Sequence, residues 1–297
     1  MPLIPSPPDA VPANDADGAG AARSASHVAA PLWRVLAVSG HGLWAWLGLA
    51  LLLGYQQGRN DTLLPLAVGL ILAGFGLLLA CLPGRAPRDW YGWRPRRDSR
   101  PTRAALLAFV TCLPMLGVAG LARGDNEFWA TRLAGAALAL CSLASLAYNN
   151  YDRRQPWRPL APSSSSLVPV RRLLFAAYAG SLWLWALSLA QDQSDSPFLG
   201  RPWLLLALVL AVATGSMGAL RWRSLGQRRP ERTAALRSAR WLAMTLGYGV
   251  PVLALALAVA PQLPTPLLAA VVAVPSCLAG RWLEQRQLAV VRGNDLR

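Results

Sequence analysis

Eight runs of mostly apolar residues, separated by polar connections, dominate this sequence of 297 residues. A helix needs about 20 such residues to cross the hydrocarbon core of a bilayer. Only helices and closed barrels satisfy their backbone hydrogen bonds there. The pattern therefore predicts an all-α, polytopic membrane helix bundle with eight transmembrane helices. We place these helices at residues 35–55, 62–82, 104–122, 128–148, 173–190, 203–220, 240–260 and 265–283.

The composition supports a membrane protein. Hydrophobic residues make up 54% of the chain and charged residues only 14%, whereas a soluble domain is about one-quarter charged. Residues 1–33 are rich in Pro, Ala, Gly and Ser and contain no apolar run, so we expect a flexible cytoplasmic tail. Residues 34–284 then form the membrane domain, and residues 285–297 a C-terminal cytoplasmic tail.

The basic residues predict the orientation. All 29 are arginines, and the formal net charge is +15. With eight spans, four arginines (Arg59, Arg123, Arg132 and Arg201) fall on one side of the membrane, which leaves 25 on the side of both termini. Positively charged loops stay in the cytoplasm. The chain is therefore expected in a bacterial inner membrane, with both termini cytoplasmic and no affinity for nucleic acid.

The arginine-rich connections between the predicted helices have two interpretations. Arginine beside a membrane attracts anionic lipid headgroups, worth about 1 kcal/mol per residue. Arginine and tryptophan are also typical anchors of protein interfaces, so the same loops could dock a soluble partner. The candidate lipid or partner contacts are Arg85, Arg88, Arg94, Arg96, Arg97, Arg153, Arg154 and Trp157.

Histidine supplies the one candidate for chemistry inside a predicted span. Of the two histidines, His27 lies in the tail and His41 in the first span, so two histidines cannot hold a haem within this chain. A neutral imidazole at His41 could exchange a hydrogen bond with a quinol hydroxyl. Ser39 and Trp44 would complete that site. The alternative is a structural histidine bonded to a neighbouring backbone carbonyl.

Cysteines and carboxylates give no further site. Cys81, Cys112, Cys141 and Cys277 lie in apolar runs or at their edges, without the CxxC spacing of a metal site, and are expected to be packing residues. The sequence thus predicts that the chain binds no cofactor of its own. Glu284 falls at the edge of the last span, which argues against a carboxylate-coupled transporter.

Small residues and prolines predict features of the helix packing. Small side chains at four-residue spacing let membrane helices approach closely; they recur at Ala207, Ala211 and Gly215, and at Gly135, Ala139 and Ser142. Proline inside a span removes a backbone donor. This occurs at Pro114, Pro251 and Pro275.

Four short stretches resemble the membrane-anchor subunits of dimethyl sulfoxide reductase-type molybdoenzymes. GLLLACLPGRAPRDWYGW closes the second predicted helix, AYNNYDRRQPW follows the fourth, LAMTLGYGVPVLALALA forms the seventh, and CLAGRWLEQ closes the eighth. The resemblance implies an eight-helix anchor that oxidises menaquinol or ubiquinol. It also implies that an iron–sulfur subunit receives the electrons and passes them to a molybdopterin catalytic subunit, in anaerobic respiration.

The chain departs from this family at two positions tied to quinol. The family usually has a histidine in the turn after the second helix and an acidic residue after a serine that opens the third. Here these stretches read Leu82-Pro83-Gly84 and Ser99-Arg100-Pro101, which offer no proton-transferring group. Either the quinol site has moved, as to His41, or the chain no longer oxidises quinol.

Two other functions fit the same sequence. A stand-alone small-molecule permease or facilitator would use helices shaped by the prolines. A structural assembly protein would bind only lipid. Neighbouring genes for a molybdopterin subunit and an iron–sulfur subunit would favour the anchor.

Overall fold

The structure, a computed structural model, describes residues 14–55, 58–81, 103–122, 128–148, 167–192, 196–228, 236–260 and 266–293. These ranges are helical apart from short turns and contain no strand, so the all-α prediction is confirmed. The elements are α1 (Asn14–Leu53), α2 (Arg59–Cys81), α3 (Arg103–Leu121), α4 (Trp129–Tyr148), α5 (Leu167–Ala190), η1 (Pro197–Leu199), α6 (Arg201–Arg228), α8 (Arg237–Met244), η2 (Thr245–Gly249), α9 (Val250–Val259) and α10 (Pro266–Gly293).

All eight predicted runs fall on helices, with α8, η2 and α9 together forming the seventh. Within the described ranges, six segments are long and apolar enough to cross a membrane: Arg34–Leu53, Trp129–Ala147, Pro169–Ala190, Arg201–Gln227, Arg237–Val259 and Pro266–Leu288. In α3 the apolar stretch is shorter, Phe109–Leu121.

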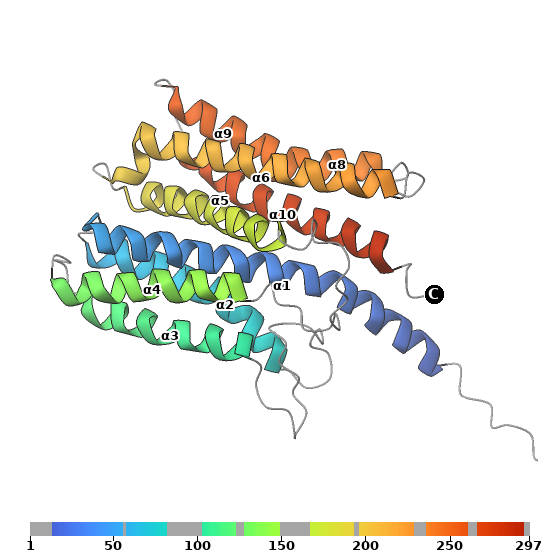
Figure 1. Cartoon of the computed structure of the whole chain (residues 1–297), viewed down its shortest axis with the longest axis horizontal. Coiled ribbons are helices and arrows are strands. Elements are labelled where there is room, and N and C mark those ends of the chain that lie inside the picture. Colours follow the sequence, from blue (N-terminus) through green and yellow to red (C-terminus); the bar gives the residue numbers. More distant parts are fainter. Residues whose placement is uncertain are drawn as a thin grey trace, which may run out of the picture.

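The helices form an antiparallel bundle of two halves (Figure 1). One half contains α1 to α4, the other contains α5 to α10, and α1 joins them by packing on α2, α4, α5 and α10. The first residues of α1, α3, α5 and α8 lie at the end of the bundle where α2, α4, α6 and α10 finish. We call this the basic end because α5, α6, α8 and α10 carry most of their arginines near it: Arg171, Arg172, Arg221, Arg223, Arg237, Arg240, Arg281 and Arg286.

Helix α1 begins earlier than the sequence suggested. It starts at Asn14 and runs without a break to Leu53, and its first turns project beyond the bundle (Figure 1). The sequence predicted a tail without regular structure through residue 33. Alanine recurs throughout this stretch, and it is the best helix former of all residues, so the helix can extend past the apolar run.

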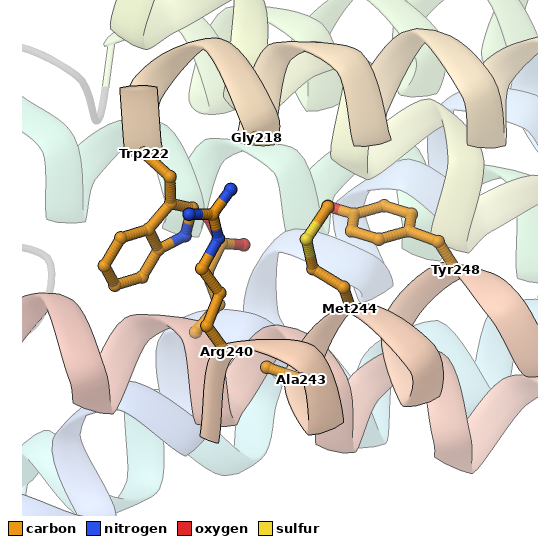
Figure 2. Close-up of a pocket in the computed structure, with 7 residues that line it drawn as sticks. Gly218, Trp222, Arg240, Ala243, Met244 and Tyr248 are labelled. Atoms are coloured by element: carbon orange, nitrogen blue, oxygen red, sulfur yellow. The ribbon is translucent and has the colours of Figure 1, made fainter. Parts of the chain in front are cut away.

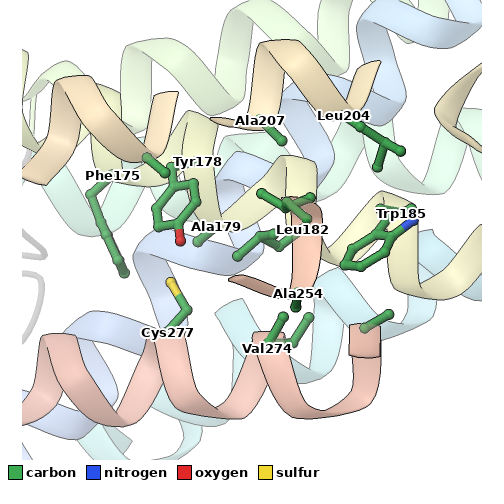
Figure 3. Packing of buried hydrophobic residues seen from close by; sticks show 14 of the residues in the cluster. Phe175, Tyr178, Ala179, Leu182, Trp185, Leu204, Ala207, Ala254, Val274 and Cys277 are labelled. Atoms are coloured by element: carbon green, nitrogen blue, oxygen red, sulfur yellow. The ribbon is translucent and has the colours of Figure 1, made fainter. Parts of the chain in front are cut away.

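Each half has its own apolar core. In the first half, Trp44 and Leu47 of α1 pack with Leu66, Val118 and Leu138 from the other three helices. The second core is larger and combines aromatic residues of α5 with small residues of α6, α9 and α10 (Figure 3). Its central members are Phe175, Tyr178, Leu182, Trp185, Ala207, Ala254, Val274 and Cys277. The predicted packing role of cysteine holds for Cys277, which is fully buried here.

Glycines allow α1 to contact two neighbours at backbone distance. A Cβ atom on Gly42 would collide with the backbone carbonyl of Ala176 in α5, and one on Gly180 would collide with the backbone of Gly42. Towards α4, Gly48 approaches Gly135 and Ala139 in the same way. The predicted close contact at Gly135 and Ala139 is thus confirmed, and its partner is the centre of α1.

The outer surface is apolar, the inverse of a soluble protein. In the middle of α6 the small residues Ala207 and Ala211 are buried, while the larger side chains of Leu205, Val209 and Val212 point outward. An outward apolar face on this scale is typical of lipid contact. Other helices add similar exposed residues: Leu113, Leu116, Leu133, Leu140, Leu253, Leu268 and Val271.

Proline changes the helical pattern where α8 passes into α9. The residues Thr245–Gly249 form a π-helical turn, and Pro251 follows directly. Because Pro251 has no N–H, it cannot donate to the Gly247 carbonyl four residues earlier. The hydroxyl of Tyr178 in α5 donates to that carbonyl instead, at 3.4 Å. A π-helical turn of this kind often marks a functional site.

Replacing Trp46 with phenylalanine is expected to lower the free energy of unfolding by about 1 kcal/mol. The indole N–H of Trp46 donates to the Ala177 carbonyl at 2.8 Å and so links α1 to α5. Phenylalanine keeps most of the ring and removes the donor. The measurement is unfolding of the purified chain in mixed detergent micelles. Trp241→Phe is the control, since that indole is 67% exposed and should leave stability unchanged; equal losses in both variants would contradict the prediction.

Candidate functional site

His41 lies in the interior of the bundle, 3% exposed. Its Nδ1 is 2.8 Å from the carbonyl oxygen of Ala37, one turn earlier in α1. The ring also packs edge-on against Trp44, with centroids 5.7 Å apart. These contacts match the structural alternative weighed for His41, while its predicted role towards quinol stays a prediction.

The other two members of the predicted site also bond to backbone. Ser39 is fully buried and donates to the Leu36 carbonyl at 2.9 Å. Trp44 donates through its indole N–H to Leu66 in α2, at 3.1 Å. The structure therefore brings His41 and Trp44 together and connects them to α2, and His41 Nδ1, Ser39 Oγ and Trp44 Nε1 are each bonded to a backbone carbonyl of the protein.

The predicted docking residues lie outside the described residues. This applies to Arg85, Arg88, Arg94, Arg96, Arg97, Arg153, Arg154 and Trp157. Their assignment to lipid or to a partner protein stays a prediction.

A second polar group, which the sequence placed at a helix edge, is buried in α10. The predicted span ended at residue 283, but α10 continues to Gly293, and the apolar segment extends to Leu288. Arg281 and Glu284 are 7% and 6% exposed and form an ion pair one turn apart. The predicted span stopped one residue short of Glu284, whereas in the structure Glu284 is buried within the last turns of the apolar segment.

Contacts from other helices fix this α10 ion pair. The guanidinium of Arg281 lies over the ring of Phe175 in α5, at 4.9 Å from the ring centroid. Arg171 of α5 and Arg221 of α6 are close enough to interact electrostatically with Glu284. One oxygen of Glu284 binds Arg281, while the other, Oε1, has no hydrogen-bond partner among the residues described.

Glu284 opens onto a small pocket between α6, α8 and α10 (Figure 2). We call this the α6–α8 pocket. Its lining consists of Gly218, Trp222, Arg240, Ala243, Met244, Tyr248 and Glu284. Arg240 rises from α8 towards Trp222 of α6, with its guanidinium carbon 5.4 Å from the indole centroid. Met244 and Tyr248 point towards α6 farther along the same segment.

Two oxygens of the pocket lining lie close to Gly218. A Cβ atom on Gly218 would lie 3.8 Å from the Tyr248 hydroxyl and 4.0 Å from Glu284 Oε1. The Tyr248 hydroxyl, like Oε1, has no hydrogen-bond partner in the described part of the chain. Buried polar groups without a partner are uncommon and call for a ligand, a water molecule or a functional reason.

The π-helical turn positions Tyr248. It lies between Gly247, which crosses Gly280 of α10 at backbone distance, and Gly249. A Cβ atom on Gly280 would collide with the backbone of Gly247, so glycine at this crossing lets η2 lie against α10 beside the ion pair. The ring of Tyr248 then stacks against Tyr178, with centroids 6.2 Å apart.

The spacing of polar residues in the sequence of α10 could have predicted the buried ion pair. Cys277, Arg281, Glu284 and Gln287 recur at spacings of four, three and three, which places them on one face of a helix. All four are buried. The paired opposite charges of Arg281 and Glu284 lower the cost of keeping this face inside the bundle, so the helix need not end at the first of them.

The chemistry available in the α6–α8 pocket is hydrogen bonding to a neutral polar group. A carboxylate oxygen only accepts hydrogen bonds, and a phenol both donates and accepts. Within the described ranges, no three His, Cys, Asp or Glu side chains gather where they could hold a metal ion. A hydroxyl, an amine or water would satisfy both oxygens.

Comparison with known protein families, with curated proteins and with solved structures finds no match for this chain.

Proposed function

We propose that this chain is an eight-helix anchor subunit of a respiratory oxidoreductase of the dimethyl sulfoxide reductase type. In this role it holds a molybdopterin subunit and an iron–sulfur subunit on the cytoplasmic membrane of a bacterium. It oxidises menaquinol or ubiquinol and delivers the electrons to the iron–sulfur subunit. The described helices fit this role as an apolar bundle long enough to span a bilayer in at least six segments.

The observation that carries the proposal is a buried ion pair beside a pocket, next to the arginine-rich end of the bundle. Ionisable side chains inside membrane helices are costly and by default indicate function. Here Glu284 and Tyr248 face a pocket, and arginines of α5, α6, α8 and α10 surround it. The resemblance of four short stretches to the anchor family supplies the reaction class.

A pull-down in mild detergent tests the anchor role. The tagged full-length chain is purified from anaerobically grown cells, and the eluate is examined by mass spectrometry and by molybdenum and iron analysis. Co-purification of a molybdopterin protein and an iron–sulfur protein is the expected result. Recovery of the chain alone, without either metal, would contradict the proposal.

The proposed topology places both termini in the cytoplasm. Green fluorescent protein fused after Arg297 should therefore fluoresce, because it folds in the cytoplasm but not after export in unfolded form. Alkaline phosphatase fused after Asp192, at the opposite end of the bundle, should be active. A dark first fusion together with an inactive second fusion would show the reverse orientation.

One observation favours the permease as a second candidate. Carriers coupled to protons or cations usually keep a buried carboxylate, and Glu284 is one. In the structure this carboxylate is bound to Arg281, an arrangement that also stabilises a static site. Solute uptake by proteoliposomes containing the purified chain alone would favour the permease over the anchor.

A further inference from the structure

We propose that the α6–α8 pocket is where the chain binds the hydroxyl-bearing edge of a quinol, with Glu284 and Tyr248 as its hydrogen-bond partners. The inference rests on the quinol reactivity proposed above and assigns it to residues that the sequence did not single out. It places the site in the second half of the bundle rather than at His41.

The two oxygens of the pocket match the hydrogen-bonding groups of a quinol. A quinol hydroxyl needs an acceptor, and Glu284 Oε1 is a carboxylate oxygen left without a partner by the described residues. The product quinone has a carbonyl in the same place, which needs a donor. The Tyr248 hydroxyl can donate to the oxygen of either form, so Glu284 and Tyr248 together bind the quinol hydroxyl, and Tyr248 also binds the quinone carbonyl.

The ion pair leaves one oxygen of Glu284 available. Its Oε2 is bound to the guanidinium of Arg281, while Oε1 faces the pocket without a partner among the described residues. A carboxylate oxygen accepts hydrogen bonds, as a quinol hydroxyl requires.

The pocket lies beside the apolar outer surface and is small. Beside the lining residues, the side chains of Leu220, Trp241 and Leu242 are more than half exposed on the outer, apolar surface. A lipophilic molecule in the membrane would meet this surface first. The pocket is small, so only the edge of a ring enters; Gly218 leaves it open, and Met244 has the flexible side chain to make room.

Light-activated labelling with an azidoquinone tests the site on the full-length chain in native membranes. The expected result is saturable labelling of peptides that contain Trp222 or Met244, competed by a short-chain quinone. Tyr248→Phe should weaken the apparent affinity about tenfold, the equivalent of one hydrogen bond in a buried site. Glu284→Gln should do the same.

Gly218→Ala separates binding from folding. A methyl group there meets its neighbours at ordinary contact distances, so the bundle should keep its stability while the pocket is filled and labelling falls. Gly215→Ala is the matched control. Gly215 lies one turn away on α6 and does not line the pocket. A Cβ atom there would lie 3.7 Å from the ring of Tyr248, an ordinary contact distance, so labelling should be unchanged.

The possible failures differ from each other. Saturable labelling around His41, with Gly218→Ala and Tyr248→Phe unaffected, would overturn the site and leave the proposed function standing. Absence of saturable labelling from the whole chain would overturn the site and the quinol part of the proposed function together, even if the pull-down recovers both partner subunits.

Discussion

Alanine in place of Gly42 is expected to destabilise the bundle by about 3 kcal/mol, at the upper end of what overpacking costs. The added methyl group would collide with the Ala176 carbonyl and its backbone neighbours. These atoms belong to the rigid main chain of α5, so no side chain can rotate away to relieve the contact. The two helices would have to separate, and with them the two halves that α1 joins.

The control is the same substitution at Gly120 in α3. Nothing lies within 4 Å of a Cβ atom there, and the residue faces outward. Alanine is better than glycine in a helix by up to about 1 kcal/mol, so Gly120→Ala should be neutral or slightly stabilising. Both variants are unfolded side by side in mixed micelles. Equal stability of the two would mean that α1 and α5 do not touch at Gly42.

The positions of the helices could be read from the sequence because membrane physics acts locally. A run such as 240–260 must be helical to satisfy its own backbone, whatever its neighbours are. The ends were harder to predict. No apolar run predicts a helix over residues 14–33. Helix α10 continues past Arg281 and Glu284, although charged residues usually end a span.

The candidate site could be predicted only in part, because most of its partners come from distant segments. The sequence places Arg281 and Glu284 on one helix face, but it cannot show that Gly218, Tyr248 and Phe175 approach that face from three other elements. His41 stood out since it is the one histidine in a predicted span. The structure shows it bonded within its own helix, which no pattern in the sequence distinguishes from a ligand contact.

Removing one partner of the α10 ion pair is expected to cost more than any other single polar change in the described bundle. Glu284→Leu leaves the buried guanidinium of Arg281 without its carboxylate, and Arg281→Met leaves the carboxylate without its ion-pair partner. Breaking a buried pair in this way costs about 3–5 kcal/mol. Replacing both residues removes the unpaired charge, so the double variant should recover most of that loss.

The test is a double-mutant cycle on the free energy of unfolding in mixed micelles, with Arg286→Met as control. Arg286 is exposed on the next turn of α10, where its guanidinium lies over the ring of Trp282, and its loss should change stability by about 1 kcal/mol or less. Strict additivity of the two single losses would contradict a direct interaction between Arg281 and Glu284. Recovery in the double variant also allows a test of the proposed site, because the bundle is then stable without the Glu284 carboxylate. If this stable variant is no longer labelled by azidoquinone, Glu284 is needed for binding the ligand and not only for the stability of the fold.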